Sequence, residues 1–193
     1  GLYDGATLVS NFEDLNPADT IWNKAYNLYT RIDTEVPRFL EFESWWGSAT
    51  MLDKNEIMFI SDSLFIGNRF STARLRSSEG LRVDLRNIKS PILIFCSQGD
   101  DITTPQQALG WVTDLYRNDN EIITAGQTII YCLHETIGHL GIFVSSSVAT
   151  KEHDKFIQNI ELIEILPPGL YEAVFADKTN DTQHPDLATG NHV

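Results

Sequence analysis

A continuous apolar run, Ile92-Leu-Ile-Phe-Cys96, lies between Pro91 and Gly99. Such a run, closed at both ends by turn-forming residues, is typical of a strand that is buried on both faces of a parallel sheet. A second run of this kind spans residues 127–133, and residues 105–116 between them carry apolar side chains at helical spacing. Strand, helix and strand in this order form a crossover unit, so the sequence predicts an α/β fold.

A helical, aromatic-rich region precedes this unit. It contains three stretches with apolar side chains at helical spacing, at residues 19–31, 34–46 and 53–67. The third opens with Asp53, which can cap a helix while Glu56, three residues later, reaches back to it. Three such helices in succession favour a helical cap, and an ordinary three-helix core is the alternative interpretation.

On this pattern the chain has three parts. A helical cap covers residues 1–75, an α/β core covers residues 76–175, and a polar, flexible tail covers residues 176–193. Residues 81–85 alternate in polarity as a short, half-exposed strand would, and they open the core. The tail is predicted to be loose because Asn, Asp, Thr and Gly dominate it and few apolar side chains could anchor it.

The charge balance excludes some classes of partner. The chain has 27 acidic and 14 basic residues, a formal charge of −13, and no concentrated basic patch, which argues against nucleic acid and anionic membranes. The apolar runs are far shorter than a membrane helix of about 20 residues, and no signal segment opens the chain, so we expect a cytoplasmic protein without a membrane span. Cys96 and Cys132 lie in apolar runs, where a buried thiol is a better interpretation than a nucleophile, a metal ligand or a disulfide.

Acidic and imidazole side chains follow the two predicted buried strands. Asp100 and Asp101 come after the first strand, and His134 and His139 lie at or just beyond the end of the second. Because the carboxyl ends of parallel strands meet at one edge of a sheet, an acid there can accept the imidazole N–H and fix its tautomer. The alternatives are an Asp that only caps the following helix and a purely structural histidine.

A metal site is disfavoured. His139 follows His134-Glu135 one residue too late for the His-Glu-x-x-His helical spacing, and the segment leaves a strand rather than filling a helix. We therefore expect no metal and no cofactor.

Several blocks of the sequence resemble one family in the same order. They are Arg82-Val-Asp-Leu-Arg-Asn-Ile-Lys-Ser-Pro-Ile92, Asp100-Asp-Ile-Thr-Thr-Pro105, Gly138-His-Leu-Gly-Ile-Phe-Val-Ser145 and Lys151-Glu152. From about Tyr26 to Glu152 the chain resembles the C-terminal half of the polyhydroxyalkanoate synthase catalytic subunit, particularly the type that works with a second subunit. It is still more similar to a poorly characterised, synthase-like family.

The resemblance implies a fold and an activity. These synthases are α/β-hydrolase-fold acyltransferases that use a Cys–His–Asp triad on hydroxyacyl-CoA thioesters, so an acyl-CoA is an expected substrate. By position, Asp100 corresponds to the acid of the triad and His139 to its general base. The second place of the family's turn is usually His or Asn and is Asp101 here, which raises the question of which carboxylate acts, and we favour Asp100.

The nucleophile is the main departure from the family. In the family the nucleophile sits on a Gly-x-Cys-x-Gly-Gly type of turn before the cap. Residues 1–193 of this chain contain neither that pattern nor Gly-x-Ser-x-Gly. By resemblance, residues 1–75 are the cap and residues 76–175 are the C-terminal half of the hydrolase core. We expect the nucleophile and the N-terminal half of the fold to lie outside this chain, which alone would be inactive.

Two functions remain open at this point. The first is acyl transfer or hydrolysis of an ester or thioester by the complete protein, with Asp100 and His139 in the triad. That protein would act alone, as a homo-oligomer or with a second subunit. The second is a non-catalytic binding or assembly module that keeps the scaffold. The aromatic side chains of the cap, which include Trp22, Trp45 and Phe65, either wall an acyl channel or form plain core.

Overall fold

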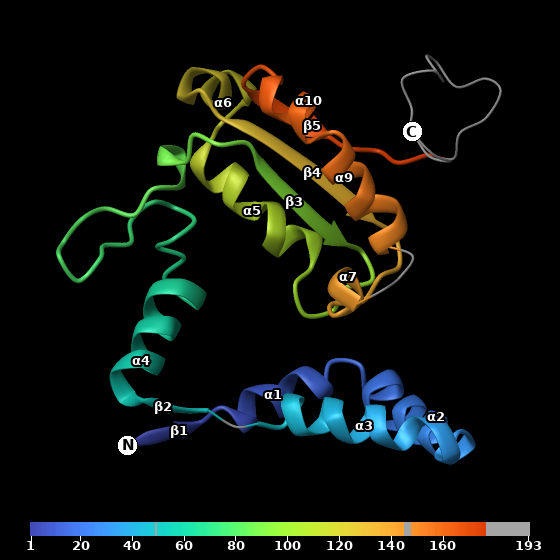
Figure 1. Cartoon of the computed structure of the whole chain (residues 1–193). Coiled ribbons are helices and arrows are strands. Elements are labelled where there is room, and N and C mark those ends of the chain that lie inside the picture. Colours follow the sequence, from blue (N-terminus) through green and yellow to red (C-terminus); the bar gives the residue numbers. More distant parts are fainter. Residues whose placement is uncertain (49, 145–147, 177–193) are drawn as a thin grey trace. The chain divides into compact units, whose positions relative to one another are not determined.

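The computed structural model describes residues 1–48, 50–144 and 148–176. The chain divides into two compact units, Gly1–Asn68 and Arg69–Val193 (Figure 1). The boundary drawn from the sequence lies at residue 75. Most of the predicted tail lies outside the described residues.

The first unit is helical. Its helices and helical turns are α1 (Ala6–Glu13), the π-helical turn η1 (Ala18–Asn23), α2 (Lys24–Thr30), α3 (Ile32–Trp46), α4 (Lys54–Phe59) and the π-helical turn η2 (Ile60–Phe65). Two short strands, β1 (Leu2–Asp4) and β2 (Met51–Asp53), pair antiparallel and join the start of the unit to the start of α4. The three predicted helical stretches are therefore confirmed, each with a change of helical geometry or an earlier start.

Polar contacts fix the ends and neighbours of these helices. The predicted capping box at α4 is confirmed, because the Asp53 backbone N–H donates to Glu56 Oε2 at 2.8 Å and the Glu56 N–H donates to Asp53 Oδ1 at 3.0 Å. Lys24 of α2 donates to Glu13 at 3.3 Å and to Glu43 of α3 at 2.9 Å. Burial lowers the pKa of Lys24, but the hydrogen bonds and charges of Glu43 and Glu13 outweigh it and leave that pKa raised.

The apolar side chains of this unit are largely exposed. Among its described residues no apolar side chain is fully buried, and Trp22, Tyr29 and Phe65 are 73%, 78% and 75% exposed. Trp45 and Trp46 form an aromatic group with Phe42, with ring centroids about 6 Å apart. The helices thus present apolar faces that their own packing leaves uncovered.

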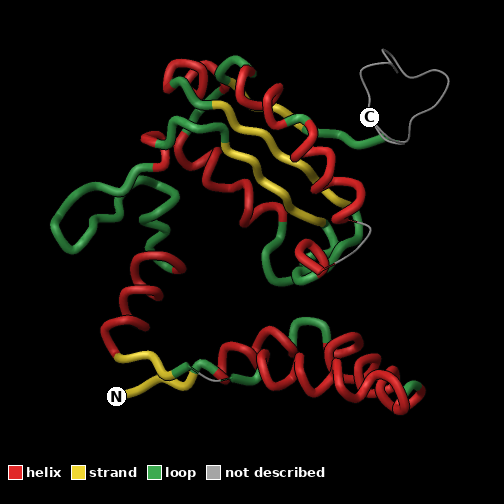
Figure 2. Tube along the Cα trace, viewed as in Figure 1, coloured by secondary structure: helices red, strands yellow, loops and turns green. Residues whose placement is uncertain are grey.

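The second unit is built on a parallel sheet. Its strands are β3 (Ile92–Ser97), β4 (Thr128–His134) and β5 (Gly169–Glu172), in the order β3-β4-β5 (Figure 2). The two predicted strands are confirmed as β3 and β4, but burial on both faces is not confirmed for β3, which lies at the edge of the described sheet with Leu93 41% exposed. β5 has no counterpart in the sequence-based prediction. A parallel sheet with crossover helices places this unit in the α/β class, as predicted.

Helices cover both faces of this sheet (Figure 1). They are α5 (Pro105–Leu115), α6 (Asp119–Ala125), the π-helical turn η4 (Ala149–His153), α9 (Asp154–Gln158) and α10 (Ile160–Ile165). The short α7 (Gly141–Val144) lies beyond the strand ends. On the α5 face, Val112, Tyr116, Ile122 and Ile129 form the core with Ile94 against them. On the opposite face, the Phe95 ring of β3 lies 6.1 Å from the His153 ring of η4.

The prediction of a strand over residues 81–85 is wrong. Only an isolated bridge joins Arg76 and Arg82, and the 3-10 helix η3 (Leu85–Asn87) follows. Asp84 explains the difference, because its carboxylate accepts from the Arg86 backbone N–H at 3.1 Å and from the Arg86 guanidinium at 2.8 and 2.7 Å. These local bonds give the backbone an alternative to a strand ladder.

A buried amide ties this segment to the sheet. The side chain of Gln127, which is 0% exposed, donates to Leu85 O at 2.7 Å and Ile88 O at 3.2 Å. Its own carbonyl oxygen accepts from the Tyr116 hydroxyl. Burial raises the pKa of that hydroxyl, which therefore remains a donor. All polar groups of the Gln127 side chain are thus paired in the interior, as buried amides require.

Candidate functional site

The Asp100 carboxylate lies in the turn between β3 and α5. It is 2% exposed, and its Oδ1 atom accepts from the backbone N–H groups of Ile102 at 2.9 Å and Thr103 at 2.8 Å. Thr104 and Pro105 then begin α5. One carboxylate oxygen therefore does what a capping Asp does, and the other oxygen is left for a different partner.

That partner is His139. The Nδ1 atom of His139 lies 2.9 Å from Asp100 Oδ2, and the His139 side chain is 33% exposed. A buried carboxylate at this distance accepts the Nδ1–H proton, so Nε2 is the ring nitrogen that can take a proton from another group. Nε2 has no hydrogen-bond partner among the described residues. The structure brings the two predicted site residues together, although β4 ends at His134 and not at the Gly138-His139 pair.

The turns that carry the two side chains are in direct contact. The Gln98 backbone N–H donates to His134 O at 2.9 Å, which extends the β3–β4 pairing into the turns. At Gly99 the backbones approach so closely that a Cβ atom would lie 2.4 Å from Thr136 O. Glycine is therefore required at this position, because any side chain would displace one turn from the other.

Asp101 and the two cysteines take no part in the contact between Asp100 and His139. Asp101 is exposed on the same turn, and Asp100 is the carboxylate bonded to His139. Cys96 and Cys132 are buried free thiols, as predicted. Burial raises the pKa of Cys96, and it raises the pKa of Cys132 to about 12 with help from the Glu152 charge. Neither thiol has the thiolate character that a nucleophile needs at neutral pH.

The chain matches a known protein family over its whole length. Residues 1–193 match the family described as "Protein of unknown function (DUF3141)". The chain belongs to this family. It is 53% identical, over its whole length, to the "Uncharacterized protein in ackA 5'region" of Rhizobium meliloti, and it spans about a quarter (26%) of the length of that relative. No solved structure matches the chain.

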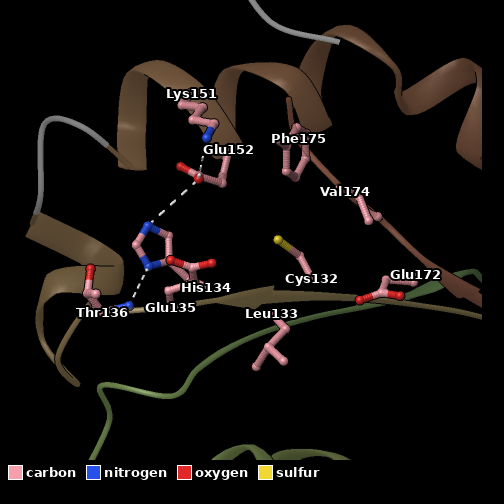
Figure 3. A pocket seen from close by; sticks show the side chains of 11 residues that line it. Cys132, Leu133, His134, Glu135, Thr136, Lys151, Glu152, Glu172, Val174 and Phe175 are labelled. Carbon is pink, nitrogen blue, oxygen red and sulfur yellow. Dashed lines mark hydrogen bonds and ion pairs between the residues drawn. The ribbon is translucent and has the colours of Figure 1, made fainter. Parts of the chain in front are cut away.

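A cavity of about 380 Å³ in the DUF3141 chain is lined in part by residues 132–136, at the end of β4 and the start of the turn that follows it (Figure 3). Its walls come from the end of β4, from η4 and from the segment after β5, and Cys132, His134, Glu152 and Phe175 point into it. The Glu152 side chain is 5% exposed, and its Oε1 atom lies 3.9 Å from His134 Nε2 and 4.0 Å from Lys151 Nζ.

Sequence reasoning missed part of this arrangement. It singled out His134 and noted Lys151-Glu152 only as part of a resemblance, and it did not foresee that Glu152 faces His134.

Two findings bear on metals and membranes. Over residues 1–48, 50–144 and 148–176, no group of three or more His, Cys, Asp or Glu side chains is placed to hold a metal ion. No helix in that part of the chain has the length and apolar character that crossing a bilayer requires.

Proposed function

We propose that this chain is part of a polyhydroxyalkanoate synthase-like α/β-hydrolase that transfers or hydrolyses the acyl group of an ester or thioester. The observation that carries the proposal is the 2.9 Å contact between His139 Nδ1 and the buried Asp100 carboxylate at neighbouring strand ends. The order of acid and histidine along the chain, and the family-like blocks around them, support the same assignment.

The proposed chemistry uses a nucleophile from outside residues 1–193. His139 Nε2 takes the proton of a Cys thiol or Ser hydroxyl as that group attacks the acyl carbon, and Asp100 stabilises the imidazolium that forms. The bond between the acyl carbon and its thiol or alcohol breaks, and the leaving group receives the proton from His139. In the second step His139 deprotonates water or the hydroxyl of a hydroxyacyl group as that oxygen bonds to the acyl carbon. The bond between the acyl carbon and the nucleophile breaks, and His139 returns the proton to the nucleophile.

Two observations favour an outside nucleophile. Cys96 and Cys132 are buried within strands, and their raised pKa values keep both thiols protonated. The share of the Rhizobium meliloti relative that this chain spans leaves about three quarters of that protein to supply other residues.

The test uses the natural full-length protein with 3-hydroxybutyryl-CoA and with p-nitrophenyl butyrate. We expect His139→Ala to lower kcat by about 10³-fold or more, because loss of a triad member removes most of the chemical rate. His153→Ala is the matched control, since His153 lies in η4 and its ring packs against Phe95 of β3. Activity that survives in His139→Ala would disprove the triad, and a native protein that turns over neither compound would favour the non-catalytic module.

A further inference from the structure

The turn that leads from β4 to His139 is closed by an imidazole. The Nδ1 atom of His134 accepts from the backbone N–H group of Thr136 at 3.1 Å (Figure 3) and from that of Ile137 at 3.2 Å. This is the pattern of an Asx turn, in which a side chain accepts from residues two and three positions further on. Residues 135–138 have no regular secondary structure, so these two bonds hold half of the N–H groups of the turn.

This arrangement requires one tautomer of His134. To accept from two N–H groups, Nδ1 must carry no proton, which places the proton of the neutral ring on Nε2. Nε2 lies 3.9 Å from the Glu152 carboxylate, and that side chain is 5% exposed. At this distance the attraction is electrostatic rather than a hydrogen bond, but a buried negative charge beside Nε2 favours the proton there.

The turn closed by His134 determines the position of His139. Its backbone packs against Gly99, next to Asp100, and Gly141 N–H donates to Gly138 O at 2.9 Å on the far side of His139. The Asp100–His139 contact therefore depends on two turns kept in register, and the His134 ring fixes one of them.

We infer that His134 is a positioning residue, whose Nδ1 atom closes the 134–137 turn and thereby holds His139 against Asp100, with Glu152 favouring the required tautomer. The inference rests on the proposed function, since it assigns His134 a part in the reaction through His139. His134 itself does not contact the reacting atoms.

Two variants of the full-length protein separate this role from simple packing. His134→Asn keeps an acceptor, because Asn Oδ1 and His Nδ1 are both bonded to Cγ and Asn is a preferred residue for such turns. His134→Leu keeps an apolar volume and removes the acceptor. His153→Asn is the matched control on the same face of the sheet, where the His153 ring contacts Phe95.

The first readout is turnover of the acyl thioester. We expect His134→Leu to lower kcat by about 10²-fold, as a displacement of about 1 Å of a catalytic group does, with KM changed by less than about threefold. His134→Asn should retain kcat within about threefold of the native protein, which would show that the acceptor and not the imidazole is needed. A kcat that is unchanged in His134→Leu, or lost equally in His134→Asn and His134→Leu, would overturn the inference.

The second readout does not depend on activity. Diethyl pyrocarbonate modifies neutral imidazole, and the rate at His139 can be followed by peptide mass spectrometry. Loss of the Asp100 carboxylate releases the His139 ring, whose side chain is 33% exposed in the native fold, so Asp100→Asn should speed its modification. His134→Leu should do the same, and His134→Asn should not. An effect of Asp100→Asn without one of His134→Leu overturns the positioning role and leaves the proposed triad standing. The full pattern in a protein without acyl transfer leaves the positioning role standing and removes the proposed function.

Discussion

At the scale of single residues, the site depends on close contacts that few side chains can make. Asp100 uses one oxygen to bind the backbone of its own turn and the other to hold His139, so its carboxylate has no freedom to rotate. Gly99 lets the neighbouring turn approach to backbone contact. The orientation of His139 is thus fixed before any substrate binds, which is the condition for efficient proton transfer.

Gly99→Ala should disturb this contact. Its Cβ atom would lie 2.4 Å from Thr136 O, so the turns must separate, and overpacking of this kind costs about 1–3 kcal/mol of unfolding free energy. Gly110→Ala is the matched control, because nothing lies within 4 Å of that Cβ position in α5 and alanine favours a helix interior by about 0.5–1 kcal/mol. Denaturant unfolding measures both changes. Equal stability of the Gly99→Ala variant and the native protein would contradict the close approach.

The Cys132 thiol should be inert. Because its pKa is raised to about 12, it stays protonated below that pH, and alkylation by iodoacetamide at pH 8 should be at least about 10²-fold slower in the folded protein than in urea. The reaction is followed by peptide mass spectrometry, which distinguishes Cys132 from Cys96. Rapid labelling of folded Cys132 that His139→Ala abolishes would instead make this thiol the nucleophile.

At the scale of elements, the two strands with long apolar runs could be predicted from the sequence. β5, which depends on its pairing with β4, could not. β3 and β4 are evident in the sequence because each carries a continuous apolar run bounded by turn-forming residues. β5 is four residues long and follows Pro167-Pro168, and it exists because Thr128–Tyr131 of β4 offers a free edge to it. Residues 81–85 carry a strand pattern, but the hydrogen bonds between Asp84 and Arg86 favour the 3-10 helix η3 over a strand.

The candidate site divides in the same way. The Asp100–His139 pair follows from the order of two strand ends, which the sequence displays. The positions of His134 and Glu152 relative to each other do not, because Glu152 belongs to η4 on a separate helical return. No local pattern indicates that a helix will place a carboxylate beside a particular imidazole.

The Asp84–Arg86 pair should give part of the acid stability of the second unit. The Arg86 guanidinium lowers the pKa of Asp84 from 3.8 to about 2, so the folded state favours the charged carboxylate. This stabilisation is complete above about pH 4 and is lost as the pH falls from about 4 through 2. At pH 7 Asp84→Asn should therefore lower the unfolding free energy by roughly 1–2 kcal/mol, and its difference from the native protein should shrink below pH 3.

Urea unfolding at pH 7, 4 and 2.5 measures this difference. Glu79→Gln is the control, because Glu79 is exposed in the preceding turn. A difference between Asp84→Asn and the native protein that stays constant from pH 7 to pH 2.5 would show that the carboxylate charge is not what stabilises the segment.

At the scale of the whole molecule, the two units differ in how much apolar surface they bury by themselves. The second unit has a core with Ile122 and Ile129 at 1% and 0% exposure, whereas no apolar side chain is fully buried among the described residues of the first. Exposed apolar faces of this extent are typical of surfaces that another part of a protein covers.

Residues 1–68 should therefore not fold cooperatively alone. We expect circular dichroism of that fragment to show helix that melts gradually, and residues 69–193 to unfold in a cooperative transition, because burial of apolar surface supplies most of the folding free energy. A sharp thermal transition in the 1–68 fragment would show that its helices are stable without a covering surface.

If Asp100 acts through His139, the two residues form one catalytic unit, and a double-mutant cycle on the full-length protein measures this dependence. The measurement is kcat for 3-hydroxybutyryl-CoA turnover in the native protein, Asp100→Asn, His139→Ala and the double variant. We predict that each single change lowers kcat by about 10³-fold or more and that the double variant is no slower than His139→Ala, because residues acting as a unit are not additive. Losses that multiply in the double variant, or a native rate in either single variant, would contradict the account.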